Sequence, residues 1–325
     1  MTKEAPGASV TAVLDRDSQG AGVSGSVYSR VIDFADDETP LWHFPMMNDS
    51  VRNDGYDKAL GSALKSKKGT VLEIGTGSGL LALMAARHGA TQVTTCEAVP
   101  SIAKKAKNII QQNGYADRIR VFEGLSTNLA GGREIPERFD VLVTEIFDDG
   151  LLGEGAFKSI RHAKEHLLKA GAQIIPARVR VMAMGIESKE IFQNYNVNTA
   201  SGFDLRAFNE FTVRDYVGIH LDKMAYRALT LPAPVFTFDF NNLPTKESKP
   251  IDMAIIQSGD LHAIAYWFEL YLDEDTVVSS GPGLAKLSSW KQAVQLVENV
   301  NSYQLGEQIS AVAFHDESAI WFERR

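Results

Sequence analysis

The sequence has a single cysteine, no long apolar run and no excess of positive charge. Cys96 stands alone among 325 residues, so an intrachain disulfide and a cysteine-rich zinc module are both excluded. No segment approaches the roughly 18 apolar residues of a membrane span, and the N-terminus lacks the apolar core of a signal peptide. The formal net charge of -8 argues against nucleic-acid binding through a basic surface. We therefore expect a cytoplasmic protein with no membrane contact, no direct nucleic-acid binding and no metal.

Large apolar side chains are scarce in the first 25 residues, which are rich in Gly, Ala, Ser and Thr. Such a segment buries too little surface to fold, so we expect residues 1–25 to be disordered and order to begin near Val27. The whole chain is 44% apolar, which is enough for one large or two medium domains with cores of their own.

Strand and helix patterns alternate from Thr70 to Pro176. "TVLEI" reads as a strand, "GLLALMAARHG" as a helix and "QVTTCE" as the next strand, which together form a βαβ unit. The series continues with a helix over 101–114, strands over 118–122 and 139–145, a helix over 156–171 and a strand over 172–176. This pattern predicts an α/β, Rossmann-like domain over residues 26–176, built on a mostly parallel sheet.

The remaining residues, 177–325, have shorter segments with alternating apolar positions, such as "RVRVMAMGI", "PVFTFDF" and "ISAVAF". Alternation of this kind predicts a mainly antiparallel, β-barrel-like domain. The stretch around 188–212 is more polar and more helical, so we expect it to form a helical arm inserted into the β framework.

A glycine-rich loop lies between the first predicted strand and helix. Glycines such as Gly75 and Gly77 let the backbone turn tightly and approach a ligand closely. A dinucleotide-binding GxGxxG motif requires glycine where Leu80 stands, and Glu73 would repel phosphates. The ExGxGxG spacing suits S-adenosylmethionine better, and Glu97, at the end of the next strand, can accept both ribose hydroxyls.

The stretch "TEIFDDGLLGEG" places Glu145 and Glu154 nine residues apart around an apolar, glycine-rich turn. Acids that face solvent need no such setting. The pair therefore predicts a site for a positively charged group.

Four motifs together resemble the protein arginine N-methyltransferases: "WHFPMMNDSVRN", "VLEIGTGSG", "CEAV" and "LVTEIFDDGLLGEG". The resemblance runs from about Trp42 to the C-terminus and is closest to the branch of subtypes seven and nine, whose members usually carry two tandem modules where this sequence has one. It implies a class I methyltransferase domain, the cofactor S-adenosylmethionine and an arginine-containing protein substrate. Glu145 and Glu154 match the double-E loop of that family.

The chemistry of arginine explains why two acids are needed. A guanidinium stays protonated at physiological pH and spreads its charge over three nitrogens, so each nitrogen is a poor nucleophile. Two carboxylates that grip the planar group can orient it and draw charge away from the attacking nitrogen. We expect Glu145 and Glu154 to be the catalytic residues.

The resemblance also assigns roles outside the acid pair. Arg52 is expected to pair with the cofactor's methionine carboxylate, His43 to touch the cofactor, and Ser126 or Thr127 to lie beside the adenine. Together with Glu73, Gly75, Gly77 and Glu97 they form the expected cofactor site. Met46 is expected near the target arginine.

One loop departs from the pattern of many relatives. They carry Thr-His-Trp, with Trp290 in this sequence matching the tryptophan of the arginine pocket, but Ser288 and Ser289 precede it here. The histidine that pairs in those relatives with an aspartate matching Asp49 is absent, so a His/Asp dyad cannot operate.

Other functions are compatible with some of these motifs. A methyltransferase could act on lysine, glutamine or a small guanidino compound, and a catalytically silent scaffold or a dehydrogenase could share the fold. The stretch "HAKEH", with His162, Glu165 and His166, matches a zinc-peptidase pattern, but no third ligand is evident and a solvated helix face explains it.

Family members dock a helical arm on the cofactor domain of a second module. The insertion here contains several apolar residues, including Phe192, Phe203, Phe208 and Phe211, which would form an exposed patch unless covered. We expect a head-to-tail homodimer. The alternative is that the insertion folds back onto its own β domain.

Overall fold

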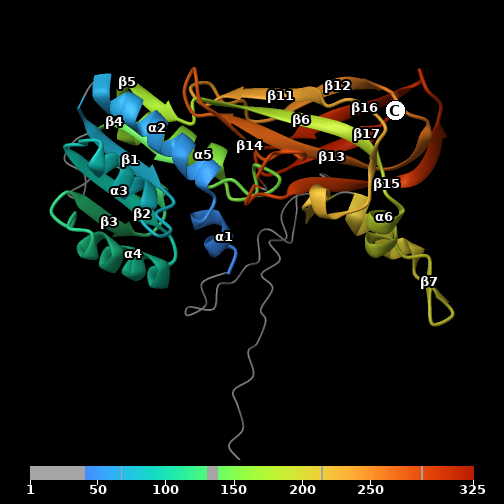
Figure 1. Cartoon of the computed structure of the whole chain (residues 1–325), viewed down its shortest axis with the longest axis horizontal. Helices are drawn as coiled ribbons and strands as arrows, with labels where there is room; N and C mark the ends of the chain where they lie inside the picture. Colours follow the sequence, from blue (N-terminus) through green and yellow to red (C-terminus); the bar gives the residue numbers. More distant parts are fainter. Residues whose placement is uncertain (1–40, 67, 130–137, 214, 287) are drawn as a thin grey trace, which may run out of the picture.

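The computed structural model describes residues 41–66, 68–129, 138–213, 215–286 and 288–325. The segment 1–25 and the expected start of order near Val27 lie outside these ranges. Within them the chain forms a parallel-sheet domain followed by an antiparallel domain, which lie side by side along the long axis of the molecule (Figure 1). None of the helices in the described ranges combines the length and apolar character needed to cross a bilayer.

The first domain contains one sheet in the order β3-β2-β1-β4-β5, and every neighbouring pair is parallel. Its strands are β1 (Thr70–Ile74), β2 (Gln92–Glu97), β3 (Ile119–Glu123), β4 (Phe139–Thr144) and β5 (Leu168–Ile175). The chain starts in the middle, moves outward to β3 and returns to the other side of β1. The order therefore reverses between β1 and β4, which is where sheets of this kind bind ligands. The predicted Rossmann-like sheet is confirmed.

Helices connect the parallel strands and precede the first one. They are α1 (His43–Met47), α2 (Ser50–Ser66), α3 (Leu80–Arg87), α4 (Pro100–Gln112), the 3-10 turn η1 (Ser126–Leu129) and α5 (Ala156–His162). Gly89 and Gly114, both with positive φ, follow the ends of α3 and α4, and Pro100 occupies the first turn of α4, as the sequence predicts. Right-handed crossovers place α3 and α4 on one face of the sheet and α5 on the other.

The predicted single helix over 156–171 is wrong for its last four residues. After α5 the chain forms one π-helical turn, Ala163–Leu167, and β5 begins at Leu168. Leu168 is buried and pairs with Phe139 of β4, and Gly171 has a φ of 72° that a helix cannot contain. Just before this turn, Arg161 of α5 donates to the carbonyl of Pro244 at 3.2 Å, which ties the end of α5 to the second domain.

The second domain is mainly antiparallel, as predicted, but its described strands form two main sheets and a two-stranded hairpin in the arm rather than a closed barrel. The larger sheet has the order β10-β6-β13-β15-β9, with β11 pairing with β6 and β14 with β13, and the smaller has the order β12-β16-β17. Pro250 in β12 lacks an amide donor, which confines β12 to a sheet edge. The strands are β6 (Arg178–Glu187), β9 (Val217–Ile219), β10 (Arg227–Ala228), β11 (Ala233–Asp239), β12 (Glu247–Ala254), β13 (Gly259–Tyr271), β14 (Val277–Ser279), β15 (Gln292–Tyr303), β16 (Gln308–His315) and β17 (Ile320–Arg324).

The expected arm is present, although it is only partly helical. It contains α6 (Lys189–Tyr195), a small hairpin of β7 (Thr199–Ala200) and β8 (Phe203–Asp204), a 3-10 turn (Arg206–Asn209) and α7 (Glu210–Val213). The base of α6 folds back onto its own domain, because Ile191 is buried and Phe192 lies 5.2 Å from His262. The tip projects away from both sheets (Figure 1), and Phe203 there is 71% exposed.

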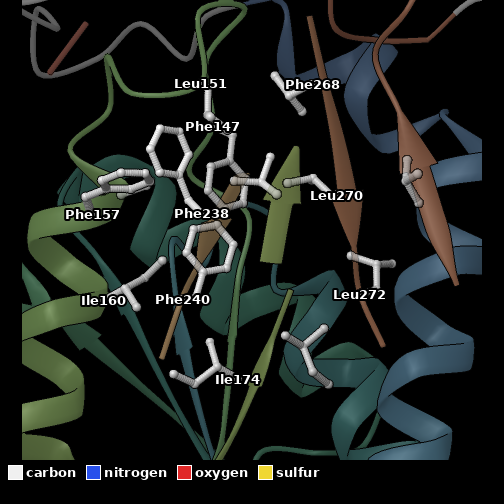
Figure 2. Packing of buried hydrophobic residues seen from close by; sticks show 14 of the residues in the cluster. Phe147, Leu151, Phe157, Ile160, Ile174, Phe238, Phe240, Phe268, Leu270 and Leu272 are labelled. Atoms are coloured by element: carbon white, nitrogen blue, oxygen red, sulfur yellow. The ribbon is translucent and has the colours of Figure 1, made fainter. Parts of the chain in front are cut away.

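The two domains share one hydrophobic core. Phe157 of α5 meets Phe238 of β11 edge-on at 4.8 Å, and Phe147 stacks on Phe240 at 5.8 Å. Figure 2 shows these rings from both domains packed together, with Leu151 beside them. Phe147 and Leu151 belong to the loop after β4, so the shared core positions that loop.

Candidate active site

Several predicted cofactor residues and the predicted catalytic Glu145 lie at the carboxyl ends of adjacent parallel strands. Gly75 follows β1, Glu97 ends β2, Ser126 follows β3 and Glu145 follows β4. Since neighbouring strands are parallel, these ends share one edge of the sheet. The structure therefore brings together four residues that are far apart in the sequence.

The glycine-rich loop turns tightly against the next strand. The amides of Gly75 and Thr76 both donate to the carbonyl of Cys96 at 3.0 Å. Gly75 has a φ of 89°, and a Cβ there would lie 2.5 Å from the side chain of Ile146. A Cβ on Gly77 would meet nothing within 4 Å. Gly75 is therefore required by the fold, whereas the space beside Gly77 is open to a ligand.

Glu97 is oriented by the backbone around it. Its two carboxylate oxygens accept hydrogen bonds from the amides of Gly77, at 3.0 Å, and Val99, at 2.9 Å. The residue is buried. Each carboxylate oxygen can accept a second hydrogen bond, so the fixed carboxylate suits a pair of vicinal hydroxyls.

Glu73 lies deeper, within β1, and is only 1% exposed. Burial raises the pKa of its carboxyl to about 8, although hydrogen bonds from Thr95 and the amide of Ala82 act in the opposite direction. One of its oxygens, Oε2, has no hydrogen-bond partner among the described residues. A buried carboxyl with an unused acceptor suits a cationic ligand group more than a phosphate.

The loop over 144–155 begins from a fixed point. Tyr56 donates to the Thr144 carbonyl at 3.1 Å, and the Thr144 hydroxyl donates to the Ile74 carbonyl at 2.9 Å. Glu145 follows directly and forms an ion pair with Arg52, with 2.7 Å between Oε2 and Nη1. The side chains are only 7% and 3% exposed, respectively. Burial raises the pKa of Glu145 to about 7, against the lowering effect of Arg52.

Glu154, the second acid, stands at the other end of the same loop. Its side chain is accessible to solvent yet surrounded by protein, and it has no hydrogen-bond or ion-pair partner within the described part of the chain. Burial raises its pKa to about 8, and the charges of Glu145, Asp148 and Asp149 add to the effect. An accessible carboxyl surrounded by other carboxylates is a favourable site for binding a cation.

Contacts with the second domain fasten the loop between these acids. The indole N–H of Trp290 donates to the Phe147 carbonyl at 2.8 Å, and the amide of Lys291 donates to Asp149 at 2.8 Å. Trp290 is buried and packs edge-on against Phe268 at 5.2 Å. The expected pocket tryptophan is thus part of the wall that supports the loop.

Helices α1 and α2 carry the remaining predicted residues. His43 is buried and stacks on Trp42 at 3.9 Å, and Met46 is half-buried on α1. Arg52, in the first turn of α2, is paired with Glu145 in this structure.

Within the described ranges no histidine pairs with Asp49, but both of its oxygens accept hydrogen bonds. Oδ1 accepts from the amide of Arg52 at 3.1 Å and Oδ2 from the amide of Ser289 at 2.9 Å. The backbone of the loop after β14 thus takes the place of the missing imidazole. This contact ties the start of α2 to the second domain.

The sequence did not point to two residues of the site, Asp148 and Tyr216. Asp148 lies on the loop between the two acids and accepts a hydrogen bond from the hydroxyl of Tyr216 in the second domain. The only sequence signal is the pair of glycines in the loop, Gly150 and Gly153. Side chains at these positions would collide with Tyr216 and Asp148, respectively.

The zinc-peptidase pattern does not form a metal site in the structure. His162 and His166 lie 4.8 Å apart, ring to ring, around the π-helical turn, and Glu165 and His166 are solvent-exposed. Across the described ranges, no group of three histidine, cysteine, aspartate or glutamate side chains could hold a metal ion.

Two family models divide the chain between them. A model described as ribosomal protein L11 methyltransferase (PrmA) matches residues 58–175, and one described as arginine methyltransferase oligomerization subdomain matches residues 177–324. The Trypanosoma brucei PRMT1 enzyme-prozyme heterotetrameric complex with AdoHcy has the same fold, with a TM-score of 0.74 over 83% of this chain and 86% of that chain, at 20% identity.

Curated relatives agree with the arginine methyltransferase model. An arginine N(omega)-methyltransferase of Streptomyces achromogenes subsp. streptozoticus is 39% identical, over 78% of this chain and 70% of its own length. Protein arginine N-methyltransferase 7 of Aedes aegypti and protein arginine N-methyltransferase 9 of Homo sapiens are 34% and 31% identical, over 85% and 81% of this chain. The chain spans only 47% and 35% of these two relatives. The chain therefore belongs to the protein arginine N-methyltransferase family, near the branch of subtypes seven and nine.

Proposed function

We propose that this protein transfers methyl groups from S-adenosylmethionine to guanidino nitrogens of arginine residues in protein substrates. The observation that carries the proposal is the acid pair. Glu145 and Glu154 flank one loop at the carboxyl edge of the sheet, and both have pKa values well above those of ordinary glutamates. Such a pair is stabilised when a cation lies between its members.

A guanidinium is the cation that fits Glu145 best. In this structure Glu145 already binds one, because Arg52 donates to it at 2.7 Å in a nearly dry environment. Planar guanidinium groups match carboxylates through parallel N–H donors. We infer that Glu145 orients the substrate guanidinium. Glu154 is accessible and has no partner among the described residues, and we infer that it binds the other edge of the guanidinium.

The open glycine loop and the oriented Glu97 support S-adenosylmethionine as the cofactor. Glu97 would accept the ribose hydroxyls, Gly75 and Gly77 would let the backbone approach, and Ser126 would lie beside the adenine. Glu73 suits the amino group, whereas His43 and Arg52 would cover the methionine end. When bound, the cofactor supplies an electrophilic methyl group on a sulfonium.

Protonation of the acids matters because the product must lose a proton. Burial and the carboxylates around Glu154 raise the pKa of its carboxyl, so in the free protein Glu154 holds a proton more readily than an ordinary glutamate. A guanidinium between the acids favours the ionised form and displaces that proton. The same carboxylate can then accept the proton that the methylated nitrogen releases.

Free arginine, or a small guanidino compound, is the second candidate substrate. The Streptomyces relative, at 39% identity, is named for arginine without mention of protein. The acid pair recognises only the guanidinium, so it does not distinguish the two.

We also propose a head-to-tail homodimer. The arm exposes Phe203, Phe208 and Phe211 by 71%, 66% and 65%, and α1 begins beside Trp42, which is 45% exposed. Isolated apolar patches of this kind are typical of interaction surfaces. If the arm of one copy covers α1 of the next, two such contacts close a symmetric ring.

A cytoplasmic location accords with the buried, unpaired thiol of Cys96.

The experiment that tests the activity is a methyl-transfer assay with isotope-labelled S-adenosylmethionine, read by mass spectrometry. Arginine-rich peptides, matched peptides with lysine in place of arginine, and free arginine are compared. Label on the arginine peptides alone supports the protein substrate, and label on free arginine alone supports the second candidate. Label on lysine peptides, or on none of the three, would overturn the proposal.

A further inference from the structure

The loop between Glu145 and Glu154 contains a third acid, Asp148, which faces the second domain. Its Oδ1 accepts the amide of Gly153 at 2.9 Å, and its Oδ2 accepts the hydroxyl of Tyr216. Tyr216 directly precedes β9 of the second domain. One carboxylate therefore links the backbone next to Glu154 to a side chain from the other domain.

The backbone of this loop lies very close to the linking groups. A Cβ on Gly150 would be 2.4 Å from the Tyr216 ring, and a Cβ on Gly153 would be 2.1 Å from Asp148. Real Cβ atoms do not come this close to atoms they are not bonded to, so only glycine fits at either position without displacing these groups. The two glycines thus allow the close approach that the hydrogen bonds require.

Tyr216 is itself held in place. Its ring packs edge-on against Tyr266 at 5.8 Å, and the Tyr266 hydroxyl donates to the Ile320 carbonyl at 3.1 Å. Tyr266 is only 1% exposed. The Tyr216 hydroxyl is therefore presented to the loop from a rigid part of the antiparallel core.

We propose that Asp148 and Tyr216 are positioning residues that fix Glu154 relative to Glu145. The inference rests on the proposed function, because it assumes that Glu154 contacts the substrate guanidinium. Asp148 fixes the amide of Gly153 immediately before Glu154, and Gly155 immediately after it caps α5 with a φ of 75°. The backbone of Glu154 is thus restrained on both sides, and neither positioning residue needs to touch the substrate.

Two variants test this role and one serves as a control. Tyr216→Phe removes the hydroxyl but keeps the ring against Tyr266, and Asp148→Asn removes the charge but keeps the shape. Tyr226→Phe, elsewhere in the same domain, is the matched control. We expect kcat to fall at least about tenfold in both test variants, since small errors in the geometry of a reacting group are costly. Cofactor affinity should stay within about twofold, and the control should behave like the wild type.

The pH profile separates positioning from simple packing. The charges that act on Glu154 belong to Glu145, Asp148, Asp149 and Glu97, and all of them raise its pKa. Asp148→Asn removes one of these charges. Tyr216→Phe removes a hydrogen bond that favours ionised Asp148, so Asp148 becomes neutral more easily. In both variants the acidic limb of the kcat profile should therefore move to lower pH. Loss of packing alone leaves the limb where it is.

Hydrogen exchange of the amides over 148–155 provides a readout without turnover. Both test variants should exchange faster there than the wild type and Tyr226→Phe. If the wild type methylates no arginine, the proposed function fails, while faster exchange still supports the anchoring. If the wild type is active but both variants keep its kcat, its pH profile and its loop protection, the positioning role is refuted. Should Tyr216→Phe fail to fold, Asp148→Asn decides alone.

Discussion

We expect the Glu73→Gln variant to gain stability relative to the wild type as the pH rises from 4 to 8. Glu73 is almost completely buried, and its pKa is raised from 4.5 to about 8. In the unfolded chain the same carboxyl ionises near its ordinary value. Between these two values folding must take up a proton at Glu73, so the contribution of this carboxyl to the stability of the wild type falls with rising pH. Glutamine keeps the shape and cannot ionise.

The size of the effect follows from the shift. Each pH unit between the two pKa values corresponds to about 1.4 kcal/mol, so at pH 7 the relative gain is about 3 kcal/mol. With an unfolding entropy of about 2.1 cal/mol/K per residue, this corresponds to roughly 5 °C in Tm for 325 residues. A constant loss of about 1–3 kcal/mol accompanies it, because the new amide lies where Oε2 has no partner. That loss does not vary with pH.

The assay is a set of thermal or urea unfolding curves for both proteins at pH 4, 5, 6, 7 and 8. The diagnostic quantity is the change with pH of the difference between the two proteins, from which the constant loss and all other titrating groups cancel. Calorimetry with S-adenosylhomocysteine at pH 7 shows in parallel whether Glu73 also supports cofactor binding. A difference that stays flat from pH 4 to 8 would refute the reasoning, because it would mean that Glu73 ionises normally in the folded protein.

Four further outcomes are expected. Glu145→Gln should lower kcat at least about 100-fold while cofactor affinity stays within a few fold, because the guanidinium loses its charged partner; an unimpaired rate would exclude arginine as the substrate. Glu97→Ala should weaken binding of S-adenosylhomocysteine about ten- to a hundredfold by calorimetry, and unchanged affinity would place the ribose elsewhere. Phe208→Asp should convert a dimer to a monomer in light scattering and lower activity; a wild-type monomer with full activity contradicts the dimer. The contribution of His315 to stability should fall as pH drops below about 6.5, because burial lowers the pKa of folded His315 and only the unfolded chain then takes up the proton; in urea titrations His315→Leu should therefore gain stability relative to the wild type between pH 7 and pH 5.

The parallel sheet could be predicted from the sequence because its signals are local. Strand and helix periodicities, Gly89, Gly114 and Pro100 each act within a few residues, and the structure places all of them as predicted. The prediction of a helix over 156–171 is wrong at its C-terminal end, because Leu168 gains more stability by pairing with Phe139 of β4 than by extending a helix. A partner 29 residues away leaves no local pattern.

The candidate site divides in the same way. The acids and glycines were identifiable because their residue types and spacing carry the chemistry. The partner of Arg52 was not, since pairing with Glu145 depends on where α2 packs. Tyr216 was missed for a related reason: one tyrosine in a β domain carries no motif, and its role arises only from the fold that brings it to Asp148.

The core shared by the two domains has a consequence for recombination among relatives. The two family models meet near residue 176, so that residue invites a crossover between parent sequences. Yet the packing of Phe157 on Phe238 and of Phe147 on Phe240 crosses that boundary (Figure 2). A chimera joined there would combine rings selected in different parents, on the surface that supports the catalytic loop. Exchanges that move this loop, α5 and β11 together keep these ring contacts intact. The segment that must be inherited as a unit therefore extends across the boundary between the two domains.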